Sequence, residues 1–455
     1  MKKAAVIGAG ITGLATAYYL SEHEGIEVDL YEKTDRAGGK IRTYQKDGFT
    51  IELGPESYLA RKEIMTELAS AIGMEGELVR NSTGQSYIYA NKKLSALPRG
   101  AVLGVPTELG PFLATDLVSV PGKIKAGKDL IKKPGPLYTD VSVGRFFRRR
   151  LGDEVLENMI EPLLSGIYAT NIDELSLMST FPYFKEREDK YGSLIKGAIA
   201  EKPVSSHSKT KKQGQFLQFR NGLQSFIDQL LKTVQKKGVN THFNADVESI
   251  TKADGVYSVT VNNETKRYDN VVVTVPHFQY KRWFDDFPLE YFKHMEATSV
   301  ATVVMAFDSA QVKNDIDGTG FVVAKKMDTA ITACTWTNKK WKHSTPEGKA
   351  LLRAYVGRPG DFIVQEKTDE EIIRLARKDL DKIMDIEGKP EFSIVTKLEQ
   401  SMPQYKTGHK SRIDAVHKYM ADNYPGLYLT GASHYGVGLP DCVRQAKETA
   451  DYIIR

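Results

Sequence analysis

The stretch Gly8-Ala9-Gly10-Ile11-Thr12-Gly13 decides the fold predicted for this chain of 455 residues. It follows a short apolar run at residues 4–7, and its glycines have the spacing Gly-x-Gly-x-x-Gly. The residues after it have the apolar period of a helix. The pattern predicts a strand, a glycine turn and a helix, with phosphate groups facing the backbone N–H groups at the positive end of that helix. The apolar positions of the predicted helix are Leu14, Ala15, Ala17, Tyr18 and Leu20.

Each glycine has a separate physical task. Gly8 permits a tight turn, Gly10 lets the backbone approach a pyrophosphate, and Gly13 lets the helix and the strand pack closely. A second strand at residues 28–31 ends at Glu32, at the distance where an adenosine ribose hydroxyl needs an acceptor. A carboxylate at this place, rather than arginine, argues against a ribose phosphate. The sequence therefore predicts a dinucleotide site.

Length and composition limit the class of protein. At 50.8 kDa the chain is too long for one ordinary core, so we expect two or three lobes. Hydrophobic residues at 41% and charged residues at 27% are typical of a soluble globular protein. A net charge of +5 does not by itself indicate nucleic acid. The two cysteines, Cys334 and Cys442, are far apart, which disfavours a disulfide framework and fits a reducing cytoplasm.

The first residues imitate a secretory signal peptide, because Met1-Lys2-Lys3 precedes an apolar stretch. Cleavage after that stretch would destroy the predicted nucleotide site, so we expect no signal peptide. No window reaches the roughly 18 apolar residues that span a bilayer. We therefore expect a soluble or peripheral protein.

Further glycines suggest a cofactor larger than a nicotinamide dinucleotide. Gly38-Gly39-Lys40 follows the acidic strand, and a Gly-Pro turn at Gly54-Pro55 precedes a helix around residues 62–72. Near the other end, residues 427–430 form a predicted strand that enters a turn at Gly431, and Gly436 and Gly438 precede a helix. Pro440 and Asp441 are typical of the first turn of a helix. We expect the positive end of this last helix to face the cofactor.

These segments together resemble the flavin amine oxidase superfamily. Within it, the stretches Gly54-Pro55-Glu56-Ser57-Tyr58-Leu59-Ala60-Arg61-Lys62 and Ala96-Leu97-Pro98-Arg99-Gly100 are most similar to the bacterial protoporphyrinogen/coproporphyrinogen oxidases. The resemblance implies non-covalent FAD, with the backbone of Val247 against the adenine. The cofactor-binding residues expected from the motifs and the resemblance are Gly8, Ala9, Gly10, Ile11, Thr12, Gly13, Glu32, Lys33, Gly39, Lys40, Gly54, Pro55, Glu56, Ser57, Val247, Gly431, Val437, Gly438 and Leu439.

The expected fold class is α/β (α+β overall). It combines a Rossmann-like FAD-binding domain, a mixed-sheet substrate domain and a helical lobe. The expected FAD-binding domain is discontinuous (residues 1–75, 213–276 and 401–455), the helical lobe is 97–200, and the substrate-binding domain is 76–96 with 277–400. Polar residues 201–215 have no apolar period and predict a mobile loop.

The helical lobe contains a basic run. Between Pro121 and Arg150, nine basic residues against two acidic ones leave a local charge of +7. Such a run is either a solvated helix face or a basic amphipathic surface for anionic lipid or a polyanionic substrate. Related enzymes have a membrane-associated helical lobe at this place, so contact with a membrane is one expectation.

The resemblance implies an enzyme that oxidises coproporphyrinogen III to coproporphyrin III in haem biosynthesis. Hydride leaves a methylene bridge for the flavin, pyrrole protons leave to solvent, and dioxygen is reduced to hydrogen peroxide. The alternatives are a protoporphyrinogen IX oxidase, a flavin amine oxidase, and a non-catalytic flavin- or haem-binding partner. Covalent flavin in amine oxidases uses a cysteine near the C-terminal loop, where this chain has Gly431-Ala432-Ser433-His434.

Substrate carboxylates need cationic partners. The candidate substrate-binding residues are Arg61, Lys62 and Arg99, with Tyr355 as a cavity-lining residue. The electron-rich pyrroles activate the carbon–hydrogen bond, so no catalytic acid or base is assigned and the catalytic residues stay unknown. We expect no metal site and no nucleic acid partner. The expected location is the cytoplasm, or peripherally the inner face of the cell membrane, and other haem-pathway enzymes are possible partners.

Overall fold

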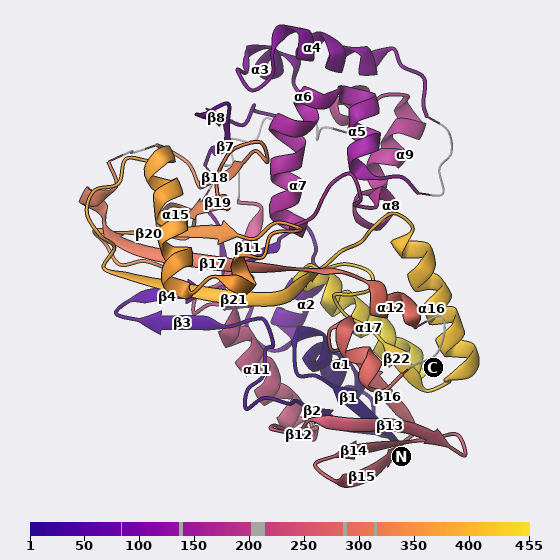
Figure 1. Ribbon diagram of the computed structural model, residues 1–455. Coiled ribbons are helices and arrows are strands. Elements are labelled where there is room, and N and C mark those ends of the chain that lie inside the picture. Colours follow the sequence, from indigo (N-terminus) through magenta and orange to yellow (C-terminus); the bar gives the residue numbers. More distant parts are fainter. Residues whose placement is uncertain (83, 136–139, 202–213, 285–288, 314–315) are drawn as a thin grey trace. The chain divides into compact units, whose positions relative to one another are not determined.

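The computed structural model describes residues 1–455 except 83, 136–139, 202–213, 285–288 and 314–315 (Figure 1). The predicted mobile loop at 201–215 therefore lies almost wholly outside the described residues. The chain divides into two compact units. Unit 1 comprises Met1–Arg80, Gln215–Glu296 and Lys410–Arg455, and unit 2 comprises Asn81–Gly214 and Ala297–His409.

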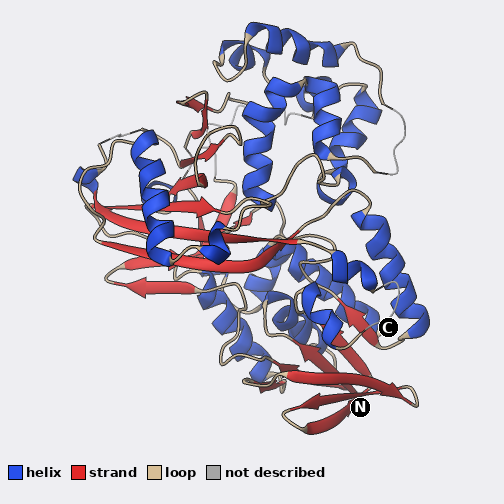
Figure 2. Cartoon of the chain, viewed as in Figure 1, coloured by secondary structure: helices blue, strands red, loops and turns tan. Residues whose placement is uncertain are grey.

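Unit 1 is built on a five-stranded parallel sheet with the order β12-β2-β1-β16-β22. The strands are short and, apart from β12, largely buried, and the helices α1, α11 and α17 share one apolar core on the sheet. A three-stranded antiparallel meander, β13-β14-β15, contacts the sheet at β1 and β16. The unit thus contains the parallel sheet and packed helices expected of a Rossmann-like fold; Figure 2 shows its strands and helices. Its elements are β1 (Lys2–Ile7), α1 (Ile11–Ser21), β2 (Ile26–Tyr31), β3 (Thr43–Lys46), β4 (Phe49–Glu52), β5 (Tyr58–Leu59), α2 (Ile64–Ala71), η1 (Glu75–Glu77), β6 (Leu78–Arg80), β11 (Phe216–Phe219), α11 (Leu223–Lys236), β12 (Asn240–His242), β13 (Val247–Ala253), β14 (Val256–Val261), β15 (Glu264–Tyr268), β16 (Asn270–Val273), η4 (His277–Arg282), α12 (Glu290–His294), α16 (His409–Asn423, from the last residue of unit 2), β22 (Leu427–Leu429) and α17 (Leu439–Ile454).

Unit 2 contains a mixed seven-stranded sheet with the order β21-β17-β20-β19-β18-β7-β8. One face of this sheet packs on α15 through an apolar core, as expected for an amphipathic helix over alternating strands. Helices α3 to α10 form the helical part of the same unit. Its elements are β7 (Ser86–Ala90), β8 (Lys93–Ala96), β9 (Ala101–Val102), β10 (Val105–Pro106), α3 (Leu109–Ala114), α4 (Val120–Gly127), η2 (Lys128–Leu130), α5 (Val143–Leu151), α6 (Asp153–Val155), η3 (Leu156–Ile160), α7 (Glu161–Tyr168), α8 (Leu177–Thr180), α9 (Pro182–Tyr191), α10 (Leu194–Ala200), β17 (Ala297–Asp308), η5 (Ser309–Gln311), β18 (Gly320–Val323), β19 (Ile331–Trp336), α13 (Thr337–Lys340), β20 (Lys349–Val356), α14 (Ile363–Glu366), α15 (Asp369–Ile383) and β21 (Phe392–Pro403).

The two units and the three expected domains follow different boundaries. The expected FAD-binding domain lies in unit 1 except for residues 213–214 and 401–409. The expected helical lobe lies wholly in unit 2. The expected substrate domain is divided between the units, because 76–80 and 277–296 belong to unit 1. The three-domain division stays a prediction.

The basic run at residues 121–150 is divided by the fold. Arg150 is fully buried and pairs with Asp129 and with Glu188 at 3.3 Å. Arg149 also pairs with Glu188, at 2.6 Å, and Arg148 pairs with Asp173 at 2.7 Å. These three arginines are therefore engaged in ion pairs, with Asp129 of the run itself and with Asp173 and Glu188 from later segments of unit 2. Helix packing, which the charge count does not see, brings those residues together.

Candidate functional site

The first glycine turn has the steric features that the sequence predicts. Gly8 has a φ of +100° and donates its N–H to the Tyr31 carbonyl at 2.7 Å, which joins β1 to β2. A Cβ on Gly13 would lie 1.8 Å from the Gly8 carbonyl oxygen, so only glycine allows α1 to approach the turn this closely. A Cβ on Gly10 would instead have no protein atom within 4 Å. Gly10 thus opens a space beside the backbone, which is where a pyrophosphate would bind.

Helix α1 begins with its backbone donors available to a ligand. Its N-cap residue is Gly10, and among the described residues no side chain caps this end and no acidic residue lies in its first turn. The first N–H groups of a helix have no partner within the helix, and the helix dipole is positive there. This donor set fits an anionic phosphate, and the open space at Gly10 gives it room.

The second glycine pair crosses the first turn. Gly38 donates its N–H to the Ala9 carbonyl at 2.8 Å, and a Cβ on Gly39 would lie 3.5 Å from the Gly10 Cα. Gly38 and Gly39 both have positive φ values, +111° and +57°. A third segment follows closely, since a Cβ on Gly54 would lie 1.8 Å from the carbonyl oxygen of Lys40. The expected cofactor segments are therefore layered on one another.

Sequence reasoning missed the side chain that holds the second turn. The guanidinium of Arg36 donates to three backbone carbonyls, those of Ala37, Gly39 and Ile41, at 3.2, 2.6 and 3.0 Å. A guanidinium offers five donors in a fixed plane, so one arginine can define a loop. The sequence feature that could have indicated this role is the position of Arg36, two residues before the glycine pair.

Glu32 stabilises the glycine turn through hydrogen bonds. Its side chain is 8% exposed; Oε2 accepts from the Ala9 N–H at 2.9 Å and Oε1 from the Thr34 N–H and hydroxyl at 3.0 and 2.8 Å. Each carboxylate oxygen can accept more than one hydrogen bond. Glu32 can therefore keep these bonds and still accept the predicted hydrogen bond from a ribose hydroxyl. Of the neighbouring candidates, Lys33 is exposed, and buried Val247 accepts from Trp283 Nε1–H at its carbonyl, at 3.1 Å.

The C-terminal glycine loop reaches the first turn from the far end of the sequence. Gly431 has a φ of +119°, and a Cβ there would lie 3.5 Å from the Thr12 hydroxyl oxygen. Helices α1 and α17 pack against each other, and Gly438 is the N-cap of α17. The two distant glycine segments thus meet in unit 1, as a single elongated cofactor bound by both would require.

Lys40 lies where these segments meet. Its side chain is accessible. The surrounding protein partly desolvates its ammonium, which lowers the pKa, and the nearby Cys442 of α17 has the opposite effect. Burial also lowers the pKa of His277. The hydrogen bond with the Met295 carbonyl raises this pKa, and the charge of Lys40 lowers it. Lys40 therefore interacts electrostatically with Cys442 of α17 and with His277 of η4.

The predicted substrate residues fall in both units. In unit 1, Arg61 is exposed, whereas Lys62 pairs with Asp441 in the first turn of α17 at 2.6 Å. In unit 2, Arg99 is exposed on the connection between β8 and β9, and Tyr355 is half-buried on β20. Their roles stay predictions.

Tyr355 belongs to a polar sheet face that sequence reasoning did not assemble. The register pairs it with Thr302 on β17 and Ala333 on β19, and pairs Arg353 with Thr335. Because side chains alternate along a strand, these residues point away from the core under α15. Arg353 is 3% exposed with its guanidinium 5.2 Å from the Tyr355 ring, and the Tyr355 hydroxyl is 3.5 Å from Thr335 Oγ1. The sequence feature that could have indicated this face is the spacing of Arg353 and Tyr355, because residues at i and i+2 of a strand lie on the same face.

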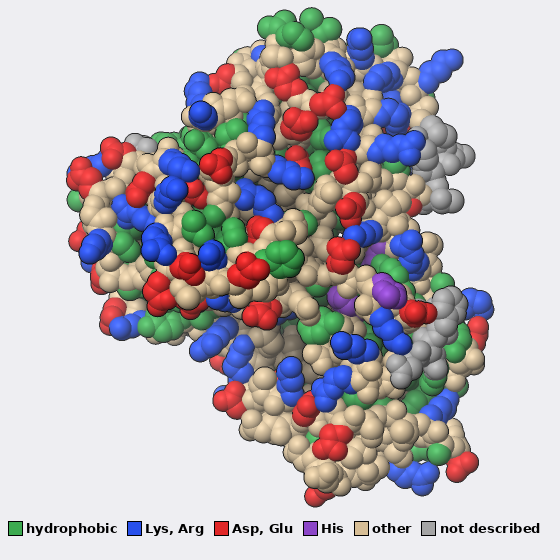
Figure 3. Space-filling view, in the orientation of Figure 1, with side chains coloured by type: hydrophobic (Ala, Val, Ile, Leu, Met, Phe, Trp, Pro, Cys, Tyr) green, Lys and Arg blue, Asp and Glu red, His purple; other side chains and the backbone are tan. Residues whose placement is uncertain are grey.

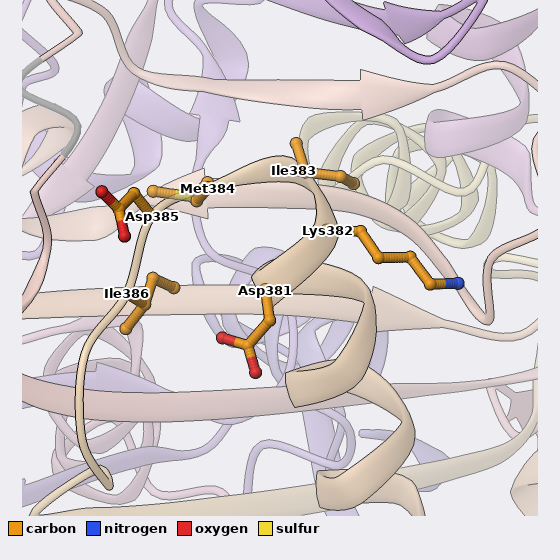
Figure 4. Close-up of a pocket in the computed structure, with 6 residues that line it drawn as sticks. All are labelled: Asp381, Lys382, Ile383, Met384, Asp385 and Ile386. Atoms are coloured by element: carbon orange, nitrogen blue, oxygen red, sulfur yellow. The ribbon is translucent and has the colours of Figure 1, made fainter.

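A separate hollow of about 380 Å³ lies at the end of α15 and contains none of the predicted site residues. One short segment lines it, so it is a surface feature (Figure 4). Within the described part of the chain, no group of His, Cys, Asp and Glu side chains could hold a metal ion. The lining residues are Asp381, Lys382, Ile383, Met384, Asp385 and Ile386.

The parallel sheet and the convergent glycine segments are typical of a nucleotide-binding protein. The chain belongs to the flavin containing amine oxidoreductase family, whose model matches residues 11–454. This membership confirms the predicted family, and a flavin cofactor follows from it. The fold class is confirmed as well by a crystal structure of an Exiguobacterium protein provisionally assigned as a protoporphyrinogen oxidase, with a TM-score of 0.90, 39% identity, and coverage of 99% of this chain and 98% of that one.

Two sequence relatives extend over nearly the whole chain. A coproporphyrinogen III oxidase of Staphylococcus aureus is 52% identical, covering 100% of this chain and 99% of the relative. A coproporphyrinogen III oxidase of Bacillus subtilis is 46% identical, covering 98% and 96%. At such identity and coverage, the similarity includes both the glycine segments of unit 1 and the sheet of unit 2.

Proposed function

We propose that this protein is an FAD-dependent oxidase that converts coproporphyrinogen III to coproporphyrin III in haem biosynthesis. The observation that carries the proposal is the 52% identity over the full length to a coproporphyrinogen III oxidase. The meeting of the Gly8–Gly13 and Gly431–Gly438 segments supports FAD, because a long dinucleotide can contact both at once.

The protein's part in this reaction is to bind and orient. Bound FAD would accept hydride from a methylene bridge of the substrate and transfer the electrons to dioxygen, giving hydrogen peroxide. The N-terminus of α1 and the space at Gly10 would hold the pyrophosphate. The positive end of α17 would favour negative charge nearby, with Lys62 holding Asp441 in its first turn. Positioning and electrostatics of this kind need no dedicated acid or base.

The polar face of unit 2 supports a substrate that carries both carboxylates and a large ring. In unit 2, Arg353 and Tyr355 supply a cation and an aromatic surface, and Arg99 is an exposed cation. Arg61 is an exposed cation of unit 1. Guanidinium groups pair with carboxylates in a bidentate manner. Coproporphyrinogen has four propionates, and protoporphyrinogen IX has two propionates and two vinyl groups.

Protoporphyrinogen IX oxidation is the second candidate, favoured by the provisional assignment of the Exiguobacterium structure. The test is to purify the protein, record its visible spectrum, and follow porphyrin fluorescence from both porphyrinogens side by side. We expect a yellow protein with faster turnover of coproporphyrinogen and one peroxide released per dioxygen consumed. Faster turnover of protoporphyrinogen would reverse the order of the two candidates. Bound flavin without turnover would indicate the non-catalytic alternative, and turnover of amines the amine oxidase.

Contact with an anionic membrane is a further part of the proposal. Apolar side chains on α3, on α4 and after η2 are exposed, with Leu113 at 62%, Val120 at 68%, Ile124 at 64% and Ile131 at 84%. Figure 3 shows hydrophobic side chains beside Lys and Arg side chains where Figure 1 places α3 and α4. Apolar residues next to lysines are typical of a surface that binds anionic lipid. The exposed lysines are Lys125, Lys128 and Lys133.

Vesicle sedimentation tests this contact. We expect the protein to sediment with vesicles that contain phosphatidylglycerol and less with vesicles of phosphatidylcholine alone. The double variant Val120→Ser with Ile124→Ser would lose the binding, whereas Phe362→Ser, at an equally exposed position of unit 2, would keep it. Equal sedimentation of both variants would contradict the proposed surface. Within the described residues, no helix is both long and apolar enough to cross a bilayer. A location in the cytoplasm or on the inner membrane face, and contacts with other haem-pathway enzymes, stay proposals.

A further inference from the structure

Three consecutive side chains of the C-terminal glycine loop are each tied to a different part of unit 1. Ser433 Oγ lies 2.9 Å from His277 Nδ1 on η4. Next to it, His434 is bonded at both ring nitrogens. Tyr435 donates its hydroxyl to Asp414 on α16 at 2.8 Å. A glycine-rich loop has little conformational preference of its own, so these side chains define its shape.

His434 is the centre of this arrangement. It is 1% exposed, with Nε2 at 2.9 Å from the Tyr280 hydroxyl and Nδ1 at 3.1 Å from His417 Nε2. Its ring also packs on Phe292 of α12, with centroids 5.2 Å apart. One side chain therefore connects the loop to η4, α12 and α16, which come from separate parts of the sequence.

In the chain Tyr280–His434–His417, burial favours the neutral forms of the two outer groups. Burial lowers the pKa of His417, although the carboxylate of Asp414 opposes this, and burial raises the pKa of Tyr280. A neutral imidazole donates from one nitrogen and accepts at the other. His434 makes one hydrogen bond at each nitrogen, with the Tyr280 hydroxyl at Nε2 and with His417 Nε2 at Nδ1. Both nitrogens of His434 are then satisfied, as burial requires.

Charged groups adjoin this chain on the α16 and α17 sides. Asp414 also accepts from Lys410 at 2.7 Å, and Arg444 of α17 donates to the Tyr435 carbonyl at 3.3 Å. On the η4 side, the charge of Lys40 lowers the pKa of His277. Through His417 and Tyr280, His434 thus joins α16, which carries these charges, to η4.

We propose that His434 is a positioning residue that holds the Gly431–Gly438 loop, and with it the start of α17, in the shape that binds the flavin. The inference rests on the cofactor part of the proposed function. The residue acts through the loop backbone: its neighbours Gly431, Val437 and Gly438 are the predicted cofactor contacts, whereas its own ring nitrogens bond to Tyr280 and His417. Loss of its bonds would leave α17 folded but free the loop to adopt several shapes, which would weaken flavin binding.

Graded substitutions test this role. His434→Ala removes both bonds, His434→Asn keeps a donor near the Nδ1 position, and His434→Gln keeps a polar group near the Nε2 position. The flavin-free proteins would be titrated with FAD, following flavin fluorescence for the dissociation constant and the visible spectrum and reduction potential of the bound flavin. We expect the dissociation constant to rise at least tenfold in His434→Ala, with a changed spectrum or potential, and to be intermediate in Asn and Gln. The control is His294→Ala, an exposed histidine of unit 1, which would leave all readouts unchanged.

A cycle with His417→Ala adds an independent measurement. Since His434 and His417 share one hydrogen bond, the double variant would lose less affinity for FAD than the two single losses combined. The inference is overturned if His434→Ala binds FAD with the wild-type dissociation constant, spectrum and potential, even when its melting temperature falls. If His434→Ala does not fold, the Asn and Gln variants decide by the same criteria. The porphyrinogen assay of the wild type separates a wrong substrate from a wrong role for His434.

Discussion

The cofactor region of unit 1 and the polar sheet face of unit 2 are built in different ways. In unit 1, backbone atoms approach closely both within a glycine segment and between segments: a Cβ on Gly13 would lie 1.8 Å from the Gly8 carbonyl oxygen, and a Cβ on Gly54 1.8 Å from that of Lys40. In unit 2, Arg353, Tyr355 and Thr302 come from two strands of a sheet and are brought together by register alone. Backbone recognition tolerates almost no substitution, whereas a side-chain surface can change residue by residue.

The largest expected effect comes from Gly13→Ala. Its Cβ would overlap the Gly8 carbonyl, where backbone on both sides cannot move apart without separating α1 from β1. We expect a loss of roughly 3 kcal/mol in the free energy of unfolding of the flavin-free protein, together with loss of flavin binding. Denaturant unfolding followed by circular dichroism measures the first effect. Unchanged stability would mean that the close approach is not a structural requirement.

Gly10→Ala is expected to separate binding from folding. Gly10 has a φ of −70°, which alanine adopts without strain, and its Cβ would meet no protein atom within 4 Å. The flavin-free stability should therefore stay within about 0.5 kcal/mol of wild type. The added methyl would occupy the space for the pyrophosphate, so we expect the dissociation constant for FAD to rise at least tenfold. If FAD bound as tightly as to wild type, the pyrophosphate would have to lie elsewhere.

Tyr355→Phe addresses the other region. The hydroxyl contact with Thr335 is long, at 3.5 Å, so little stability depends on it. Loss of one hydrogen bond to a substrate is worth about 1 kcal/mol, which corresponds to a roughly fivefold higher KM for coproporphyrinogen. Affinity for FAD should not change. A change in FAD affinity with an unchanged KM would contradict the division of roles between the two regions.

The smallest effect concerns Asp29 of β2, which joins the parallel sheet to the meander. It is 5% exposed and accepts hydrogen bonds from His242 Nε2 and the Tyr268 hydroxyl, both at 2.8 Å. Burial raises the pKa of this carboxyl, but the two hydrogen bonds together with the charges of Lys266 and His242 outweigh burial and hold the pKa below its usual value. A folded pKa below the unfolded one stabilises the protein above about pH 4, and this stabilisation is lost as the pH falls further.

Comparison of unfolding free energies at pH 6 and pH 3 measures this contribution. We expect Asp29→Asn to show a shallower loss of stability toward acid than wild type, because the amide does not titrate. Affinity for FAD at pH 7 should be nearly unchanged, since Asp29 bonds to the meander and not to the glycine segments. An equally steep loss in the variant would assign the acid sensitivity to other carboxylates.

Local sequence predicted the parts of the site that depend on steric necessity. The glycines at positions 8, 10 and 13 and the start of α17 after Gly438 could be predicted because each needs a particular residue at a particular place. Arg36 and His434 escaped prediction, since each acts on a loop whose position depends on packing. The ion pair of Lys62 was not predicted for the same reason, because its partner Asp441 lies 379 residues away in the sequence.

The sequence by itself determined the family, the Rossmann-like start, the flavin and the two glycine segments that would bind it. It could do so because spacing within a short stretch fixes which backbone conformations are possible. Only the tertiary structure decided which cations are available: Arg150 is buried in ion pairs while Arg61 and Arg99 are exposed. The tertiary structure also placed the Arg353 guanidinium beside the Tyr355 ring, and it determined the hydrogen-bond partners of His434. Burial and partnership arise from contacts between residues far apart in the chain, and no local pattern encodes them.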